Sequence, residues 1–262
     1  MIKTLLFCAS TFMLPNVLFA QKCNVSWTNL ASTPLSPTYI PQGLSTDGDD
    51  LILSVYSDRQ APYVRFFRTH KDEVVWKELT GDPQRLLHTS GIVPYRDDLF
   101  FLIDYDTGIV ALTAFSESTY EILAEWDTGR SNISSGFIYR EEDQDFLMVS
   151  TFGLRGQYLA YKIADLTGNK IRTLEEFTLS AGSFIQGTKS ISNEHFLEAR
   201  NLIGRDTIGI YRISNRDTFP VVNIPFPGRM IEDVAIADGV VYSTDESDFI
   251  LYRSTSINHC LR

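Results

Sequence analysis

A recurring pattern of apolar and polar positions divides most of this chain into five units of similar length. Each unit opens with a tripeptide of a polar residue, usually a glycine, and an apolar or β-branched residue. The tripeptides begin at Gln42, Ser90, Ser135, Gln186 and Glu232, and their middle residues lie 45 to 51 residues apart. In the last tripeptide Asp233 takes the place of the glycine. Repeats of this period are typical of propellers, solenoids and similar arrays.

Runs rich in aromatic and β-branched residues follow every tripeptide, separated by turn residues, and this pattern predicts strands. The first run of each unit spans Leu51 to Tyr56, Leu99 to Asp104, Phe146 to Thr151, Phe196 to Asn201 and Val240 to Asp245. The second spans Tyr63 to Arg68, Gly108 to Ala114, Gln157 to Ile163, Thr207 to Ile213 and Asp248 to Arg253. A last strand is predicted over Glu73 to Leu79, Tyr120 to Trp126, Ile171 to Phe177 and Phe219 to Phe226.

The fifth unit has no last strand of its own, because the chain stops at Arg262. Residues 24–30 near the N-terminus resemble residues 73–79 in pattern and in the position of the tryptophan, Trp27 against Trp76, so we expect Trp27 to be largely buried between blades. An N-terminal strand that completes the last unit would close a ring and remove exposed strand edges. The sequence therefore predicts one all-β domain over residues 21–262, a five-bladed β-propeller, with an open solenoid as the alternative.

The first twenty residues have the pattern of a secretory signal peptide. Lys3 supplies the positive charge, and a mostly apolar run from Leu5 to Ala20 follows it. An uncleaved anchor is the alternative. Two cysteines remain after cleavage, Cys23 and Cys260, and in an oxidising compartment they are expected to form a disulfide that joins the two ends. We expect a periplasmic or secreted protein.

The charge of the chain limits its partners. Removal of Lys3 with the signal peptide lowers the net charge from −10 to −11. Without a basic stripe to neutralise phosphates, neither nucleic acid nor an anionic membrane is an expected partner. The sequence favours a monomer whose partner is a small molecule, or a protein that docks on one face of the propeller.

No P-loop, dinucleotide fingerprint, nucleophile elbow or paired Cys-x-x-Cys motif is present in the sequence. The candidate site follows instead from the repeat, because a ring brings equivalent positions together at one mouth of its channel. These positions hold Gln42, Ser90, Ser135, Gln186, Glu232 and Asp233, with His88 close by. Polar groups that converge on an enclosed channel suggest a ligand site. The alternative is that they only satisfy one another and channel water.

Three motifs carry resemblances to known families. Pro41-Gln42-Gly43-Leu44, His88-Thr89-Ser90-Gly91-Ile92 and Ile231-Glu232-Asp233-Val234 together resemble a family of small secreted bacterial β-propellers, which implies fold and export. Gln42-Gly43-Leu44 is also similar to the opening of propeller-type glutaminyl cyclotransferases. That likeness implies a catalytic glutamate before the second glycine, where this chain has Ser90, so the position argues against cyclisation.

A further resemblance is to gluconolactonase-like propellers, in which a calcium ion at the channel mouth polarises a carbonyl group. It implies a divalent cation such as calcium held by Glu232 and Asp233, although neighbouring strand residues point to opposite faces. Two functional hypotheses follow. The first is an exported binding or interaction module with its ligand at the channel mouth. The second is an enzyme on the same face, either a metal-assisted lactonase or esterase or a cyclotransferase, for which no catalytic residue can be assigned.

Overall fold

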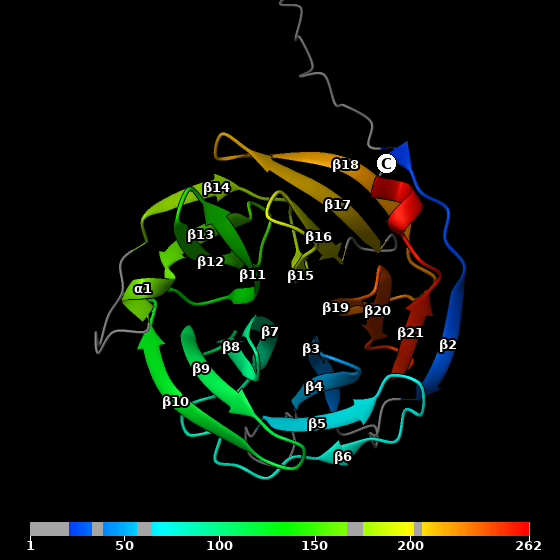
Figure 1. The fold of residues 1–262 in the computed structure, drawn as a ribbon, viewed down its shortest axis with the longest axis horizontal. Coiled ribbons are helices and arrows are strands. Elements are labelled where there is room, and N and C mark those ends of the chain that lie inside the picture. The colour runs from blue at the N-terminus through cyan, green and yellow to red at the C-terminus, as the bar shows by residue number, and fades with distance from the viewer. Residues whose placement is uncertain (1–20, 33–38, 57–63, 167–174, 202–205, 262) are drawn as a thin grey trace, which may run out of the picture.

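The computed structural model describes residues 21–32, 39–56, 64–166, 175–201 and 206–261. Its strands form five sheets arranged in a ring around a central axis, so the predicted five-bladed propeller is confirmed (Figure 1). The proposed signal peptide, and most of the strand predicted over residues 171–177, lie outside the described residues. None of the helices in the described part is long and apolar enough to cross a bilayer.

Each blade is an antiparallel sheet whose first strand lies nearest the axis (Figure 1). Blade one contains β3 (Ile40–Asp47), β4 (Asp50–Tyr56), β5 (Arg65–His70) and β6 (Lys77–Glu78). Blade two contains β7 (Thr89–Arg96), β8 (Leu99–Asp104), β9 (Ile109–Phe115) and β10 (Tyr120–Asp127). Blade three contains β11 (Ile133–Glu141), β12 (Gln144–Thr151), β13 (Gln157–Lys162) and β14 (Phe177–Ser180), with the short helix α1 (Ile163–Leu166) after β13.

Blade four contains β15 (Ile185–Ser190), β16 (His195–Arg200), β17 (Thr207–Ser214) and β18 (Asp217–Pro225). Blade five contains β19 (Ile231–Ala237), β20 (Val240–Asp245) and β21 (Ile250–Ser254), and it is completed by β2 (Trp27–Ser32) from the other end of the chain. The short β1 (Gln21–Lys22) pairs in parallel with β18, an extra strand that the sequence pattern did not predict. A 3₁₀ turn over Asn258–Leu261 ends the described chain.

Five separate apolar clusters hold the ring together, one between each pair of neighbouring blades. The cluster between blades one and two is typical, since Ile52 and Phe66 of blade one pack against Phe100 and Leu102 of blade two. The cluster between blades five and one closes the ring, with Leu44 and Leu53 packed against Tyr242 and Leu251. Buried apolar area of this kind is the main favourable term in folding, so each blade depends on both neighbours.

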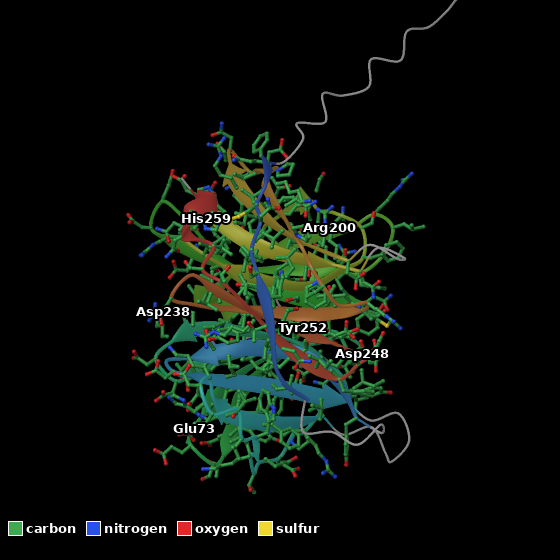
Figure 2. All side chains as sticks on the ribbon, turned by 90° about the vertical axis from the view of Figure 1, so that its right-hand side faces the viewer. Glu73, Arg200, Asp238, Asp248, Tyr252 and His259 are labelled. Atoms are coloured by element: carbon green, nitrogen blue, oxygen red, sulfur yellow. A yellow bond between two sulfur atoms is a disulfide. The ribbon has the colours of Figure 1, made fainter. Side chains whose placement is uncertain are left out.

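Both chain ends meet at blade five. Strand β2 pairs antiparallel with β21, and the disulfide Cys23–Cys260, whose Cα atoms are 5.8 Å apart, joins the segments before and after this pair. Figure 2 shows β2 beside Tyr252 of β21, with His259 at the end where the disulfide lies. Both sequence predictions about the closure, the strand and the cysteine pair, agree with the structure.

Glycine recurs in the innermost strands because these strands approach one another closely at the axis. A methyl group on Gly91 would lie 2.9 Å from Cα of Ser135 in the next blade, and one on Gly187 would lie 2.8 Å from Cα of Asp233. Real Cβ atoms do not make contacts this short, so a larger residue would push two blades apart. The glycine of the repeat is therefore a packing requirement of the channel wall.

Two expectations about the outer strands need correction. In blade one the last strand is only Lys77–Glu78 rather than residues 73–79, because Val74 adopts a left-handed conformation with φ of 48° that interrupts an extended chain. Trp27, expected to be largely buried, is half-buried. Its ring packs edge-on against Phe226 at 5.5 Å, and its indole nitrogen donates to the carbonyl of Pro225 at 2.9 Å.

Candidate functional site

A break in strand register at each repeated tripeptide determines which side chains face the channel. The pairing of every innermost strand with its neighbour shifts there, for example between Pro41 and Leu44 in β3 and between Ile185 and Gly187 in β15. The shift also falls on the tripeptide in β7 and β19, whereas in β11 it comes just before the tripeptide. A bulge of this kind bends the strand and changes the direction of a side chain. The repeated polar residue lies at this bend, and the tripeptides lie within the innermost strands rather than before them.

The side chains at these bends surround a cavity of about 240 Å³ at one mouth of the channel. It is lined by Ile40, Gln42, Tyr56, His88, Ser90, Tyr105, Phe152, Gln186, Glu232 and Glu246. The mouth opens on the face that carries Arg200 and Asp248, opposite the face with Asp238 (Figure 2). Five predicted residues therefore come together here, namely Gln42, His88, Ser90, Gln186 and Glu232.

Two carboxyl groups of blade five face each other in this cavity. Glu232, on β19, is only 5% exposed, and its side chain is hydrogen-bonded to that of Glu246, which follows β20. Burial raises the pKa of Glu232 well above its usual value, and the carboxyl groups of Glu246, Asp233 and Asp206 raise it further. The amide of Gln186 lies 3.5 Å from the Glu232 carboxyl. Two carboxyl groups can share a hydrogen bond only if one is protonated, so this contact favours a proton held on Glu232.

His88 occupies the opposite wall as a neutral base. Burial lowers its pKa, although the carboxyl of Asp106, 3.4 Å from Nδ1, opposes that shift. The amide nitrogen of Gln42 donates to the Pro41 carbonyl, so the amide oxygen of Gln42 is directed at His88 Nε2, 2.6 Å away. In this arrangement Nε2 carries a hydrogen and donates it to Gln42, while Nδ1 faces the Asp106 carboxylate.

Aromatic rings extend around the mouth from blade one to blade four. Tyr56 stacks on His88 at 4.4 Å, and the ring of Tyr105 lies 5.2 Å from that of His88. Phe152 contacts Tyr105 at 5.9 Å and Phe184 at 5.6 Å. Phe184 has a φ of 54°, which is uncommon for a bulky residue. We call Tyr56, His88, Tyr105, Phe152 and Phe184 the aromatic arc.

Ser135 does not line the cavity, although the repeat placed it there. The register of blade three shifts one residue earlier in its repeat than that of the other blades, between Ile133 and Ser135. Ser135 is fully buried, and its hydroxyl accepts a hydrogen bond from the backbone N–H of Thr188 in blade four at 2.9 Å. In this position it links two innermost strands.

Asp233 also lies outside the cavity, in the wall between blades. Its carboxylate accepts hydrogen bonds from Leu44 N at 2.8 Å and Val234 N at 2.7 Å, and it pairs with Lys189 Nζ at 3.0 Å. It occupies the space that Gly187 leaves open. Burial raises the pKa of Asp233 to about 6, against the opposing effect of the Lys189 ammonium group. Asp233 thus connects blades four, five and one.

The metal site suggested by the gluconolactonase resemblance does not assemble around Glu232 and Asp233. Glu232 faces the cavity with Glu246, whereas both oxygens of Asp233 are occupied by Lys189 and two backbone amides. In the described part of the chain, the group of three or more His, Cys, Asp and Glu side chains close enough to share an ion consists of Cys23, His259 and Cys260. Two of these are joined in the disulfide.

Besides Ile40, the sequence pattern missed four lining residues, Tyr56, Tyr105, Phe152 and Glu246. All four lie at or just after the end of the second strand of their blade. Because that strand runs antiparallel to the innermost one, its end lies beside the innermost strand's beginning. The sequence pattern predicts that these strands end at Tyr56, Asp104, Thr151 and Asp245, so the residues at and just after these ends could have been identified as lining the mouth.

Comparison with one solved structure supports the fold and goes no further. A crystal structure of glutaminyl cyclase from Myxococcus xanthus superimposes with a TM-score of 0.58 at 8% sequence identity, covering 90% of this chain and 98% of that one. A structure of a nidogen/laminin complex has a TM-score of 0.48 at 13% identity, covering 80% of this chain and 73% of that one. No protein-family model and no curated protein matches the sequence.

Proposed function

We propose that this protein is an exported, monomeric β-propeller that binds a small polar ligand at the mouth of its central channel. The observation that carries the proposal is the mouth cavity itself, where polar side chains from four blades converge on one hollow. Concave sites with a mostly apolar lining and a few converging polar groups are the usual form of small-molecule sites. Export is supported by the Cys23–Cys260 disulfide and by the pattern of residues 1–20.

A binding role is better supported than the enzymatic alternative. The cyclotransferase resemblance implies a glutamate at position 90, where this chain has a serine. The hydroxyl of Ser90 lies within 3.5 Å of the backbone carbonyls of Ile103 and Ile133. The carboxyl groups suggested as metal ligands do not face the same space, because Glu232 contacts Glu246 in the cavity whereas Asp233 is paired with Lys189 in the channel wall. At 8% identity the likeness to a glutaminyl cyclase concerns the fold and carries no activity with it.

The test is a thermal-shift screen of the mature protein against a panel of small polar metabolites, with a matched pair of glutamine variants. Gln186→Ala removes an amide from the cavity wall, whereas Gln144→Ala removes an exposed amide at the far end of β12. We expect at least one molecule to stabilise the wild type and Gln144→Ala, and to stabilise Gln186→Ala much less. If no molecule in the panel stabilises the protein, or if the molecules that do so stabilise the two variants equally, the proposal is wrong.

A further inference from the structure

Resting on the proposed function, we infer that the ligand at the channel mouth is a compact organic ammonium ion, which displaces the proton held between Glu232 and Glu246. Four observations on the mouth cavity carry this inference: the sign of its charge, the carboxyl pair, the aromatic arc and the cavity volume.

The charge of the lining excludes an anionic ligand. Among the residues that line the cavity there is no lysine or arginine, and the only ionisable groups other than tyrosine are His88, Glu232 and Glu246. Burial lowers the pKa of His88, so the imidazole does not supply a positive charge at neutral pH. Lys189, which reaches β19 from blade four, is already paired with Asp233. A phosphate, sulfate or carboxylate ligand would find no counter-charge in the lining.

The carboxyl pair is set to exchange a proton for another cation. The carboxyl groups that act on Glu232 are Glu246, Asp233 and Asp206, and all three disfavour its ionised form. His88 faces the pair across the cavity as a neutral group. An ammonium group placed beside both carboxylates would favour ionisation, because an opposite charge within a few ångströms stabilises the charged form. The ligand would then enter as the proton leaves, and the charge of the site would be conserved.

The aromatic arc suits the same ligand. Ring faces attract ammonium groups, and aromatic walls are the usual recognition surface for alkylated ammonium ions. Tyr105 and Phe152 line the cavity from blades two and three, while Glu232 and Glu246 line it from blade five. At about 240 Å³ the cavity is smaller than the roughly 300–1,000 Å³ typical of sites for drug-sized molecules, so a compact cation fits best.

Isothermal titration of the mature protein with choline, ethanolamine and 3,3-dimethylbutan-1-ol tests the inference. The alcohol has the shape of choline without its charge. We expect at least one of the two cations to bind tenfold or more tightly than the alcohol. Between the usual pKa of Glu232 and its raised pKa, the apparent Kd should increase up to about tenfold per unit fall in pH, as one proton competes with one cation. Titrations in buffers of different ionisation enthalpy should show proton release.

Two variants complete the test. Glu232→Gln keeps the shape of the protonated side chain and should abolish the preference for the cation, whereas Glu121→Gln removes a charge from an exposed position on β10 and should leave it intact. If the alcohol binds as well as the cations, or if Glu232→Gln binds them normally, the inference is overturned while the mouth remains a ligand site. If neither cation binds and the metabolite screen yields a neutral or anionic ligand, the inference alone falls. If the screen also yields none, the proposed function falls with it.

Discussion

At the scale of single residues, Glu232 combines burial at the channel mouth with a pKa raised well above its usual value. The equivalent positions of the other blades hold a neutral glutamine or serine, so nothing in the repeat itself requires a carboxyl group. Leaving such a group ionised in an enclosed site is costly, and the structure meets that cost with a proton shared with Glu246. A group kept in this state is more typical of a functional site than of a structural one.

The raised pKa of Glu232 predicts a specific pH dependence of stability. Between its usual value of 4.5 and its raised value, the folded protein keeps a proton that the unfolded chain releases. The contribution of Glu232 to stability is therefore complete below pH 4.5 and is lost as the pH rises through this window, by at most roughly 1.4 kcal/mol per pH unit.

Glu232→Gln should remove this decline, because the amide does not ionise. Urea unfolding at several pH values would show the variant gaining stability relative to the wild type as the pH rises. Glu121→Gln, at an exposed site, should follow the wild-type curve. Parallel curves for the wild type and Glu232→Gln would mean that Glu232 has an ordinary pKa.

At the scale of elements, two side chains that do not face the cavity join neighbouring innermost strands. Asp233 stands where the other blades have glycine, and it reaches β3 through Leu44 and β15 through Lys189. Ser135 joins β11 to β15 through Thr188. Both residues were predicted to face the ligand. They instead hold the wall of the channel in place, and in this way they position the residues that do face it.

We expect Asp233 and Lys189 to be strongly coupled in stability. Asp233→Asn keeps an acceptor for Leu44 N but leaves the ammonium group of Lys189, 3% exposed as a residue, without its counter-charge. Breaking a buried pair in this way costs about 3–5 kcal/mol. Lys189→Met combined with Asp233→Asn should cost clearly less than the sum of the two single changes. Equilibrium unfolding of the four proteins measures the coupling, and additive costs would show that the pair does not interact.

At the scale of the whole molecule, the ring is closed twice, by the pairing of β2 with β21 and by Cys23–Cys260. The disulfide spans a sequence separation of 237 residues, so it restricts the unfolded chain strongly, by up to about 5 kcal/mol in the chain-entropy account. Cys23→Ser, Cys260→Ser and the double variant should therefore lose the same stability, because each removes the same bond. A double variant much less stable than either single variant would indicate that the cysteines act separately.

The fold could be predicted from the sequence because every blade carries the same local pattern, and each blade packs on its neighbours in the same way. The closure could be predicted for a similar reason, since residues 24–30 repeat the pattern of residues 73–79. Within the site, Gln42, Gln186 and Glu232 follow the repeat into the cavity. Ser135 does not, because a bulge one residue earlier turns it away, and such a shift leaves no trace in the spacing of apolar residues.

The partner of Glu232 was missed for another reason. Glu246 is brought to the mouth by the antiparallel pairing of β20 with β19, and its hydrogen bond with Glu232 depends on side-chain direction. A pattern along the chain locates strand ends to within a residue or two, which is too coarse to pair two side chains. The same limit applies to Asp233 and Lys189, whose contact crosses from one blade to the next.

The most direct test of the account is an NMR titration of the imidazole signals, because the four histidines report on different places. His88 lines the channel mouth, whereas His70, His195 and His259 do not. We predict that a small polar molecule identified by the thermal-shift screen will move the signals of His88 and leave those of His70, His195 and His259 in place. Binding that shifts another histidine, or that leaves His88 unmoved, would contradict the assignment of the channel mouth as the ligand site.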